Sequence, residues 1–281
     1  MSSRRVIVTL DTAGSATAIS TAVEVARFME ADLLGLFVED ARLLSLAALP
    51  FAGEVGFPTS IRRNLDPAVM EGALRAQAQR IRRDLGARLA DEPVKWTFEV
   101  ARGRIASVLG SVTAERDIVV VAVPRAAAGE TGVRAPVGVG AQELPAPLLL
   151  VSGSLRSDGT IAIVCPPSVA PQELARVVAA LAGRYGRTAM FVHSESEAAH
   201  WDPWRRPLEE RLAEHAVVPR FFVVADGLPC APWRGDAGEP SRIVVALART
   251  PSSRDALLEA LPWPALPGGR RAVFAPGRPA A

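Results

Sequence analysis

The chain has 281 residues, of which 49% are apolar and 22% charged, and its formal net charge is +2. This composition is typical of a globular protein with an ordinary core, and the length indicates one large or two modest domains. No apolar run approaches the roughly 18 residues of a membrane span, and the near balance of acids and bases does not indicate a nucleic-acid partner.

The two cysteines, Cys165 and Cys230, argue against a disulfide scaffold and against a zinc site. The apolar run before Asp11 is too short for a signal peptide. We therefore expect a cytoplasmic protein that does not associate with membranes.

The beginning of the chain predicts a β-α-β unit. Val6–Leu10 is a short apolar run, apolar residues at helical spacing follow it, and Leu33–Val38 is a second strand-like run. Such a unit in one sheet makes a right-handed parallel crossover. The next stretch, residues 41–60, is broken by prolines and glycines, so we expect an excursion that packs over a sheet edge or a partner.

A long helix is predicted after this stretch, with Asp66 as its N-cap and Pro67 at its first position. Its apolar face consists of Leu74, Ala78, Ile81, Leu85 and Leu89. The remaining elements of the first half are strands at Trp96–Val100, Ile118–Val123 and Leu148–Val151 and a helix that begins near Ile105.

A second cycle of elements follows a small, polar stretch at 152–159, which we interpret as a linker. A helix between its first two strands is expected to end near Gly183 or Gly186, a short helix carries Leu208 and Leu212, and another is capped by Ser252 or Ser253. Its predicted strands are Ile161–Val164, Thr188–Val192, Phe221–Val224, Ile243–Leu247 and Ala272–Phe274.

The first half resembles the universal stress protein family in several segments. These are VIVTLD from residue 6, ADLLGLFVED from 31, GRIASVLGSVTAERDIVVVA from 103 and PAPLLLV from 145. The resemblance implies two flavodoxin-like, Rossmann-like α/β domains of three layers, with parallel sheets in the order 3-2-1-4-5. The domains would be residues 1–152 and a degenerate second copy, 159–281, packed as a tandem pseudo-dimer through the fifth strands Leu148–Val151 and Ala272–Phe274.

Members of this family that bind ATP carry a glycine-rich loop after the fourth strand. The resemblance assigns four cofactor-binding positions: Asp11, Val38, Gly129 and Gly132. The loop departs from the family pattern at Gln142 and Glu143, where a glycine and a hydroxyl are expected, and a carboxylate there repels phosphate. Two interpretations stay open, a nucleotide loop or a connection made permissive by Pro136, Gly138 and Gly140. Asp11 likewise either contacts a ligand or caps the following helix.

Other reactive residue types lie in the second half. His193, His200 and His215 lack the i,i+4 spacing of a helical metal site, so we interpret them as surface or strand-end histidines. Cys165 ends a predicted strand and has no base beside it in sequence, which argues against a catalytic thiol. Trp201, Trp204 and Trp233 fall in segments with prolines, and we expect them in loops at an inter-domain or dimer contact.

These observations predict a non-catalytic stress or regulatory module that has no metal and no cofactor. The alternative is an ATP- or AMP-binding switch that uses the N-terminal domain. The expected partners are an unidentified protein, the chain's own second domain in the pseudo-dimer, and a second copy in a homodimer.

Overall fold

A computed structural model describes residues 4–10, 15–49, 53–56, 61–64, 66–122, 144–152, 160–166, 168–224 and 243–247. The chain divides into two compact units, and the division falls inside one strand, between Leu149 and Leu150. The predicted linker at 152–159 lies outside the described residues except for Ser152.

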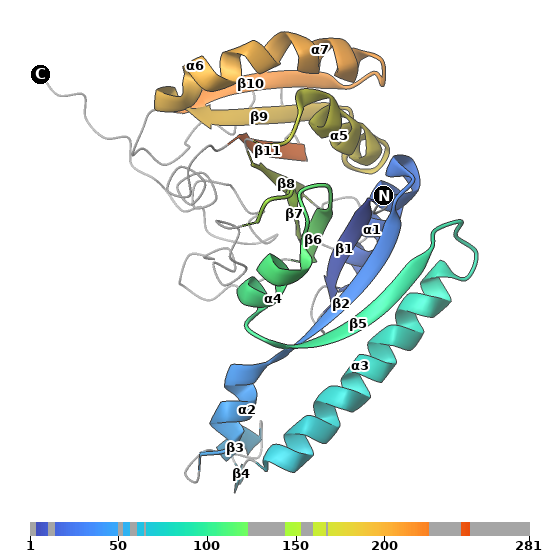
Figure 1. Cartoon of the computed structure of the whole chain (residues 1–281), viewed down its shortest axis with the longest axis vertical. Helices are drawn as coiled ribbons and strands as arrows, with labels where there is room; N and C mark the ends of the chain where they lie inside the picture. Colours follow the sequence, from blue (N-terminus) through green and yellow to red (C-terminus); the bar gives the residue numbers. More distant parts are fainter. Residues whose placement is uncertain are drawn as a thin grey trace, which may run out of the picture. The chain divides into compact units, whose positions relative to one another are not determined.

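The first unit is an α/β unit built on a parallel sheet (Figure 1). Its elements are β1 (Arg5–Leu10), α1 (Ser15–Met29), β2 (Asp32–Asp40), α2 (Ala41–Ala47), β3 (Gly53–Gly56), β4 (Ile61–Asn64), α3 (Pro67–Leu89), β5 (Trp96–Gly103), α4 (Ile105–Val112), β6 (Ile118–Ala122) and the beginning of β7 (Leu148–Ser152).

The strands of this sheet lie in the order β5-β2-β1-β6-β7. Counted along the chain without the β3–β4 hairpin, this is the predicted order 3-2-1-4-5, which is confirmed. β1 and β6 are wholly apolar at their centres, and Ile7, Val8, Val119 and Val120 have no exposed surface. Burial on both faces is typical of a parallel sheet covered by helices on either side.

Helices cover both faces of the first sheet. α1 and α3 lie on one face, where Ile19 of α1 and Ile81 of α3 line the same hollow. The crossover through α4 runs back from β5 past β2 and β1, and a right-handed connection in that direction places α4 on the opposite face. The three predicted layers follow from this reversal of direction.

The helix α3 forms as the sequence predicts. Asp66 accepts a hydrogen bond from the backbone N–H of Ala68 at 2.8 Å, and Pro67 occupies the first turn. The five predicted apolar positions are all buried: Leu74, Ala78, Ile81, Leu85 and Leu89.

The excursion predicted at 41–60 has more regular structure than expected. Asp40 caps the short helix α2, and β3 and β4 pair as an antiparallel hairpin. The prolines and glycines of this stretch break long elements but permit short ones.

The second unit also has a parallel sheet. Its elements are β8 (Thr160–Cys165), α5 (Pro171–Tyr185), β9 (Thr188–Ser194), two short 3-10 helices (Glu195–Glu197 and Asp202–Trp204) on either side of α6 (Ala198–Trp201), α7 (Arg205–Ala213), β10 (Val218–Val224) and β11 (Ile243–Leu247).

The strand order of the second sheet is β10-β9-β11-β8, so the predicted order 3-2-1-4-5 is wrong for this unit. β11, its fourth strand, pairs with β8 on one side and β9 on the other. α5 packs against all three of these strands, so the crossover from β8 to β9 passes over β11. The predicted fifth strand, Ala272–Phe274, and the helix capped by Ser252 or Ser253 lie outside the described residues.

Two smaller predictions for this unit have different outcomes. α5 ends at Tyr185, and Gly186 follows with φ +95°, a conformation that favours glycine. Trp201 and Trp204 were expected in loops, but they lie in α6 and in the 3-10 helix after it. In the part of the chain that the structure describes, no helix is both long and apolar enough to cross a membrane.

Candidate functional site at the carboxyl end of the first sheet

Of the predicted cofactor-binding residues, Val38 is the one within the described part of the chain. It is half-buried near the end of β2 and lies beside Ala101 of β5. Leu10, the last residue of β1, lies beside Phe37, so β1 and β2 end at the same edge of the sheet. The predicted residues that lie outside the described part are Asp11, Gly129, Gly132, Gln142 and Glu143, together with the loop residues Pro136, Gly138 and Gly140.

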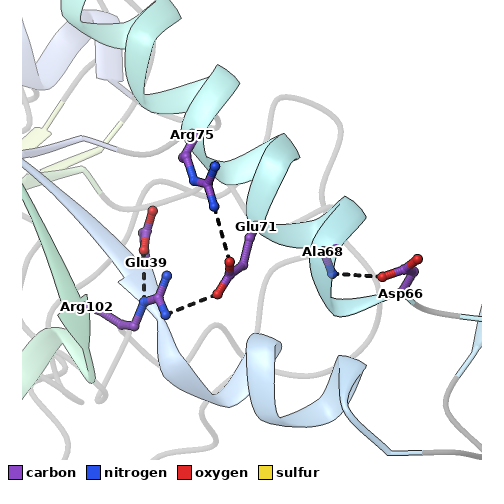
Figure 2. Close-up of polar contacts among 6 residues, drawn as sticks. All are labelled: Glu39, Asp66, Ala68, Glu71, Arg75 and Arg102. Atoms are coloured by element: carbon purple, nitrogen blue, oxygen red, sulfur yellow. Dashed lines mark hydrogen bonds and ion pairs between the residues drawn. The ribbon is translucent and has the colours of Figure 1, made fainter.

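An ion-pair network occupies the other face of the sheet at this end. Side chains alternate along a strand, so Val38 faces away from α3 and Glu39 faces toward it. Arg102, at the end of β5, donates from Nε to Oε2 of Glu39 at 3.1 Å and from Nη1 to Oε1 of Glu71 at 3.2 Å. Arg75 donates to the other oxygen of Glu71 at 3.3 Å (Figure 2).

Glu39 is the buried member of this network, with 7% of its surface exposed. A buried carboxylate needs a charged or hydrogen-bonding partner, and Arg102 supplies it. The hydrogen bond to Glu39 is also the main reason that the pKa of Arg102 is raised from its ordinary value. Arg102 therefore fastens the ends of β2 and β5 to the first turns of α3.

Asp40 forms a second ion pair beside this network. It accepts hydrogen bonds from the Arg42 guanidinium, the shortest at 2.7 Å, and from the Arg42 backbone N–H at 2.9 Å. The Arg42 side chain is the first cause, and its backbone N–H the second, of a pKa of Asp40 below the ordinary value. The bond to the backbone N–H is the N-cap of α2.

Sequence reasoning did not single out Glu39, Asp40 or Arg102. The available signal was an acidic pair at the end of one strand, in LFVED, and an arginine at the end of another, in EVARG. The carboxyl ends of neighbouring parallel strands meet at one edge, but β2 and β5 are separated in sequence by α2, the β3–β4 hairpin and α3. Their adjacency comes from the sheet.

In the second unit, Cys165 ends β8 as predicted and is fully buried. Its sulfur lies 3.5 Å from the carbonyl oxygen of Pro166. A fully buried free cysteine usually acts as a small core side chain. This environment suits a core side chain better than a nucleophile.

The three histidines occupy different settings. His193 is buried at the end of β9, and its Nδ1 lies 2.9 Å from the carbonyl oxygen of Ser194. His200 lies in α6 with its ring edge-on to Trp201, and His215 lies in the turn after α7. Within the described ranges, no group of three or more His, Cys, Asp or Glu side chains could hold a metal ion.

Trp201 is the anchor of the short helices in the second unit. It is 1% exposed, and its indole Nε1 donates to Oε2 of the buried Glu197 at 3.1 Å. Trp204 packs edge-on against it at 4.8 Å between ring centroids. These contacts lie within one unit, so Trp201 has a core role that the sequence did not indicate.

Comparison with known proteins yields structural likenesses alone. No family model matches the chain, and no curated protein matches it. The universal stress protein UspA from Lactobacillus plantarum is 16% identical, with a TM-score of 0.39 over 53% of this chain and 98% of its own. A universal stress protein from Archaeoglobus fulgidus is 11% identical, with a TM-score of 0.42 over 80% of this chain and 79% of its own. At these values neither likeness says anything about function or ligand.

Proposed function

We propose that the chain is a universal-stress-protein-like regulatory module of the cytoplasm that acts by binding partner proteins and catalyses no reaction. The observation that carries the proposal is the strand order of the first sheet, β5-β2-β1-β6-β7. The family resemblance of the sequence implies this order, and many other orders are compatible with the same elements. The proposal does not extend the family's nucleotide site to this chain.

The first sheet nevertheless has a place where open α/β sheets bind ligands. The chain leaves β1 toward β2 on one side and reaches β6 on the other, so the strand order reverses between β1 and β6. Ligands of such sheets bind at the carboxyl ends of the strands beside this reversal. Val38 lies near that end one strand away, which is why a nucleotide switch is the alternative.

Charge argues against a phosphate ligand at the described side chains. Arg102 is held by Glu39 and Glu71, and Arg42 is held by Asp40. A guanidinium that already pairs with carboxylates must break those bonds to bind phosphate. In the sequence, Glu143 adds a negative charge at a position where the family pattern has a phosphate-contacting hydroxyl.

The environment of Cys165 supports the non-catalytic part of the proposal. A nucleophilic cysteine needs access to substrate and a group that stabilises its thiolate. Cys165 has no exposed surface, and the hydrogen bond described for its sulfur goes to a backbone carbonyl.

Equilibrium dialysis of the purified full chain against labelled ATP tests the proposal. We expect no binding by the parent chain and measurable binding by the double variant Q142G/E143S, which removes a negative charge and restores close backbone approach. Adding Val38→Asp to that variant is the control, because a carboxylate at the end of β2 should abolish binding at this site.

Two outcomes contradict the proposal. ATP or AMP released from the parent chain after denaturation would favour the switch that uses the first unit. Phosphate release from ATP, above that of a heat-treated sample, would show catalysis. If Q142G/E143S gains no affinity, the length of the loop and not these side chains prevents binding.

A further inference from the structure

The outer edge of β5 is an open strand edge in the first unit. β5 ends the order of its sheet, so one side of its backbone has no strand partner among the described residues. β10 ends the second sheet, but it carries Pro219 and Arg220, which discourage edge pairing. β5 has no proline, and Val100 at its middle is 49% exposed.

The helix α3 runs beside this edge in the direction opposite to β5 (Figure 1). Near the start of α3, Glu71 binds Arg102. Near its end, Gly86 lies against Trp96, and a Cβ added at Gly86 would be 3.3 Å from the Trp96 ring. Leu85 approaches Gly35 of β2 closely. α3 therefore lies above β2 and β5 together, and one flank of the helix overhangs the open edge.

We propose that a second copy of this chain pairs with β5 in antiparallel fashion, with Val100 on the two-fold axis. A two-fold axis perpendicular to a sheet places each residue on the same face as its copy, so Val100 meets Val100 of the second copy and its exposed surface is covered. The sheet then continues from one copy into the other. This is an isologous interface, in which the same residues contribute from both sides.

The spacing of the helices supports a second copy over a lone extended peptide. Strands in a sheet lie about 4.8 Å apart, and α3 lies over the gap between β2 and β5. Two strand spacings separate this gap from its equivalent in the second copy, which places the two α3 helices about 10 Å apart, close to the usual distance for packed helices. A lone extended peptide would leave this flank of α3 uncovered.

One pair of opposite charges on the overhanging flank of α3 meets across the axis. Arg102 of β5 binds Glu71 of α3, so these two residues lie at the same level. Val100 lies two residues before Arg102, which is about 7 Å along the strand. The same distance along α3, which runs in the opposite direction, spans four or five residues after Glu71. The axis therefore passes near Ala76, so Glu71 of one copy lies level with Arg82 of the other within about one residue rise. Arg82 makes no ion pair within the described residues. The symmetry adds this contact twice, each time to a Glu71 that already accepts from Arg102 and Arg75.

Two contacts oppose the association. Arg75 lies on the same flank of α3 as Glu71 and within about one residue of the level of the axis, so it faces Arg75 of the second copy. Glu99 lies on the opposite face of β5 from Val100, and antiparallel pairing about Val100 brings it diagonal to Glu99 of the second copy. Like charges at this spacing weaken the interface without blocking it. The dimer should therefore depend on protein concentration, and Glu99→Gln should tighten it.

Sedimentation velocity of the full chain over a range of concentrations tests the pairing. We expect a monomer–dimer equilibrium that Arg82→Glu weakens roughly tenfold, since each of two exposed ion pairs becomes a repulsion. Arg83→Glu is the matched control. It makes the same charge change one residue away, on the side of α3 that faces away from the sheet. A monomer at every soluble concentration, or equal effects of the two variants, would overturn the proposal.

A disulfide trap tests the register without relying on affinity. In a chain with Cys165→Ser and Cys230→Ser, Val100→Cys should form a cross-linked dimer under mild oxidation, because directly opposed residues lie about 4.5 to 5.5 Å apart at Cα. Val69→Cys is the control, since Val69 is 68% exposed on α3 but lies away from the axis. Equal cross-linking of both variants would contradict the proposed axis.

Discussion

The strands of the two units follow the same order of elements along the chain but are arranged differently. In the first unit the central strand β1 lies between β2 and β6, and in the second unit β11 takes the place between β8 and β9. β8 and β11 are both apolar and buried, so either can occupy the middle of a sheet. Strand composition therefore determines which strands are buried on both faces, and the crossover connections determine which strands lie side by side.

In each unit a buried carboxylate accepts a hydrogen bond from a different kind of donor. In the first unit Asp117, which is 2% exposed, accepts two hydrogen bonds from the Arg5 guanidinium and one from the backbone N–H of Ala114. In the second unit Glu197, which is 8% exposed, accepts from the neutral indole of Trp201. Loss of a charged partner from a buried carboxylate costs more than loss of a neutral one.

The largest expected change in stability comes from a disulfide that tests the strand order of the second unit. Ile243 of β11 lies beside Ile161 of β8 and also beside Ala189 of β9. The pair Ala189→Cys and Ile243→Cys should form a disulfide, which stabilises the second unit by about 4 kcal/mol if the gain comes from chain entropy in a loop of this length. Urea unfolding with and without reductant measures the effect.

The matched control is the pair Ala189→Cys and Ile161→Cys. These residues lie two strand spacings apart in the observed order, about 10 Å, which is beyond the reach of a disulfide. They would be neighbours in the order 3-2-1-4-5. A disulfide in the control pair and none in the first pair would show that the second sheet has the same order as the first.

Removal of the charged partner in the first unit is expected to have the next largest effect. Arg5→Met leaves Asp117 buried without its guanidinium and should lower the free energy of unfolding by about 2 to 3 kcal/mol, allowing for the partial exposure of Arg5. Hydrogen exchange of peptides from the first unit measures the loss. Asp117→Leu added to Arg5→Met should recover part of it, and no recovery would mean that the Asp117 bond to Ala114 carries the stability.

Removal of the neutral partner in the second unit should cost less. Trp201→Phe keeps an aromatic ring but removes the donor to Glu197, so we expect a loss of about 1 to 1.5 kcal/mol in hydrogen exchange of peptides from the second unit. Trp204→Phe is the control, because it keeps the ring contact and no described hydrogen bond depends on its indole. A loss as large as that of Arg5→Met would erase the distinction between charged and neutral partners.

Replacing a glycine inside a helix should change the free energy of unfolding the least, and by nearly the same amount in the two units. At Gly72 of α3 and Gly183 of α5, an added Cβ would meet no atom within 4 Å. Gly72→Ala and Gly183→Ala should each stabilise their unit by about 0.5 to 1 kcal/mol, because alanine loses less backbone entropy in a helix. Thermal unfolding measures the gain, and Gly186→Ala, at φ +95°, should instead destabilise.

Much of the first unit could be predicted because its signals are local or shared with a family. Asp66 and Pro67 mark the start of α3, and the five apolar positions mark the face of the helix that is buried. The order of the first sheet followed from the resemblance. The network of Glu39, Arg102 and Glu71 could not be predicted, because these residues come from three elements that only the folded sheet and α3 bring together.

The sequence by itself determined the type of most of the longer described elements and the buried side of α3, because hydrophobic periodicity and capping act over a few residues. The tertiary structure decided which buried strand lies beside which, as the insertion of β11 between β8 and β9 shows. It also decided which acid meets which base, as at Glu39 and Arg102. The physical reason is that two equally apolar strands are interchangeable in composition, and the packing of the crossover helix α5 distinguishes their positions.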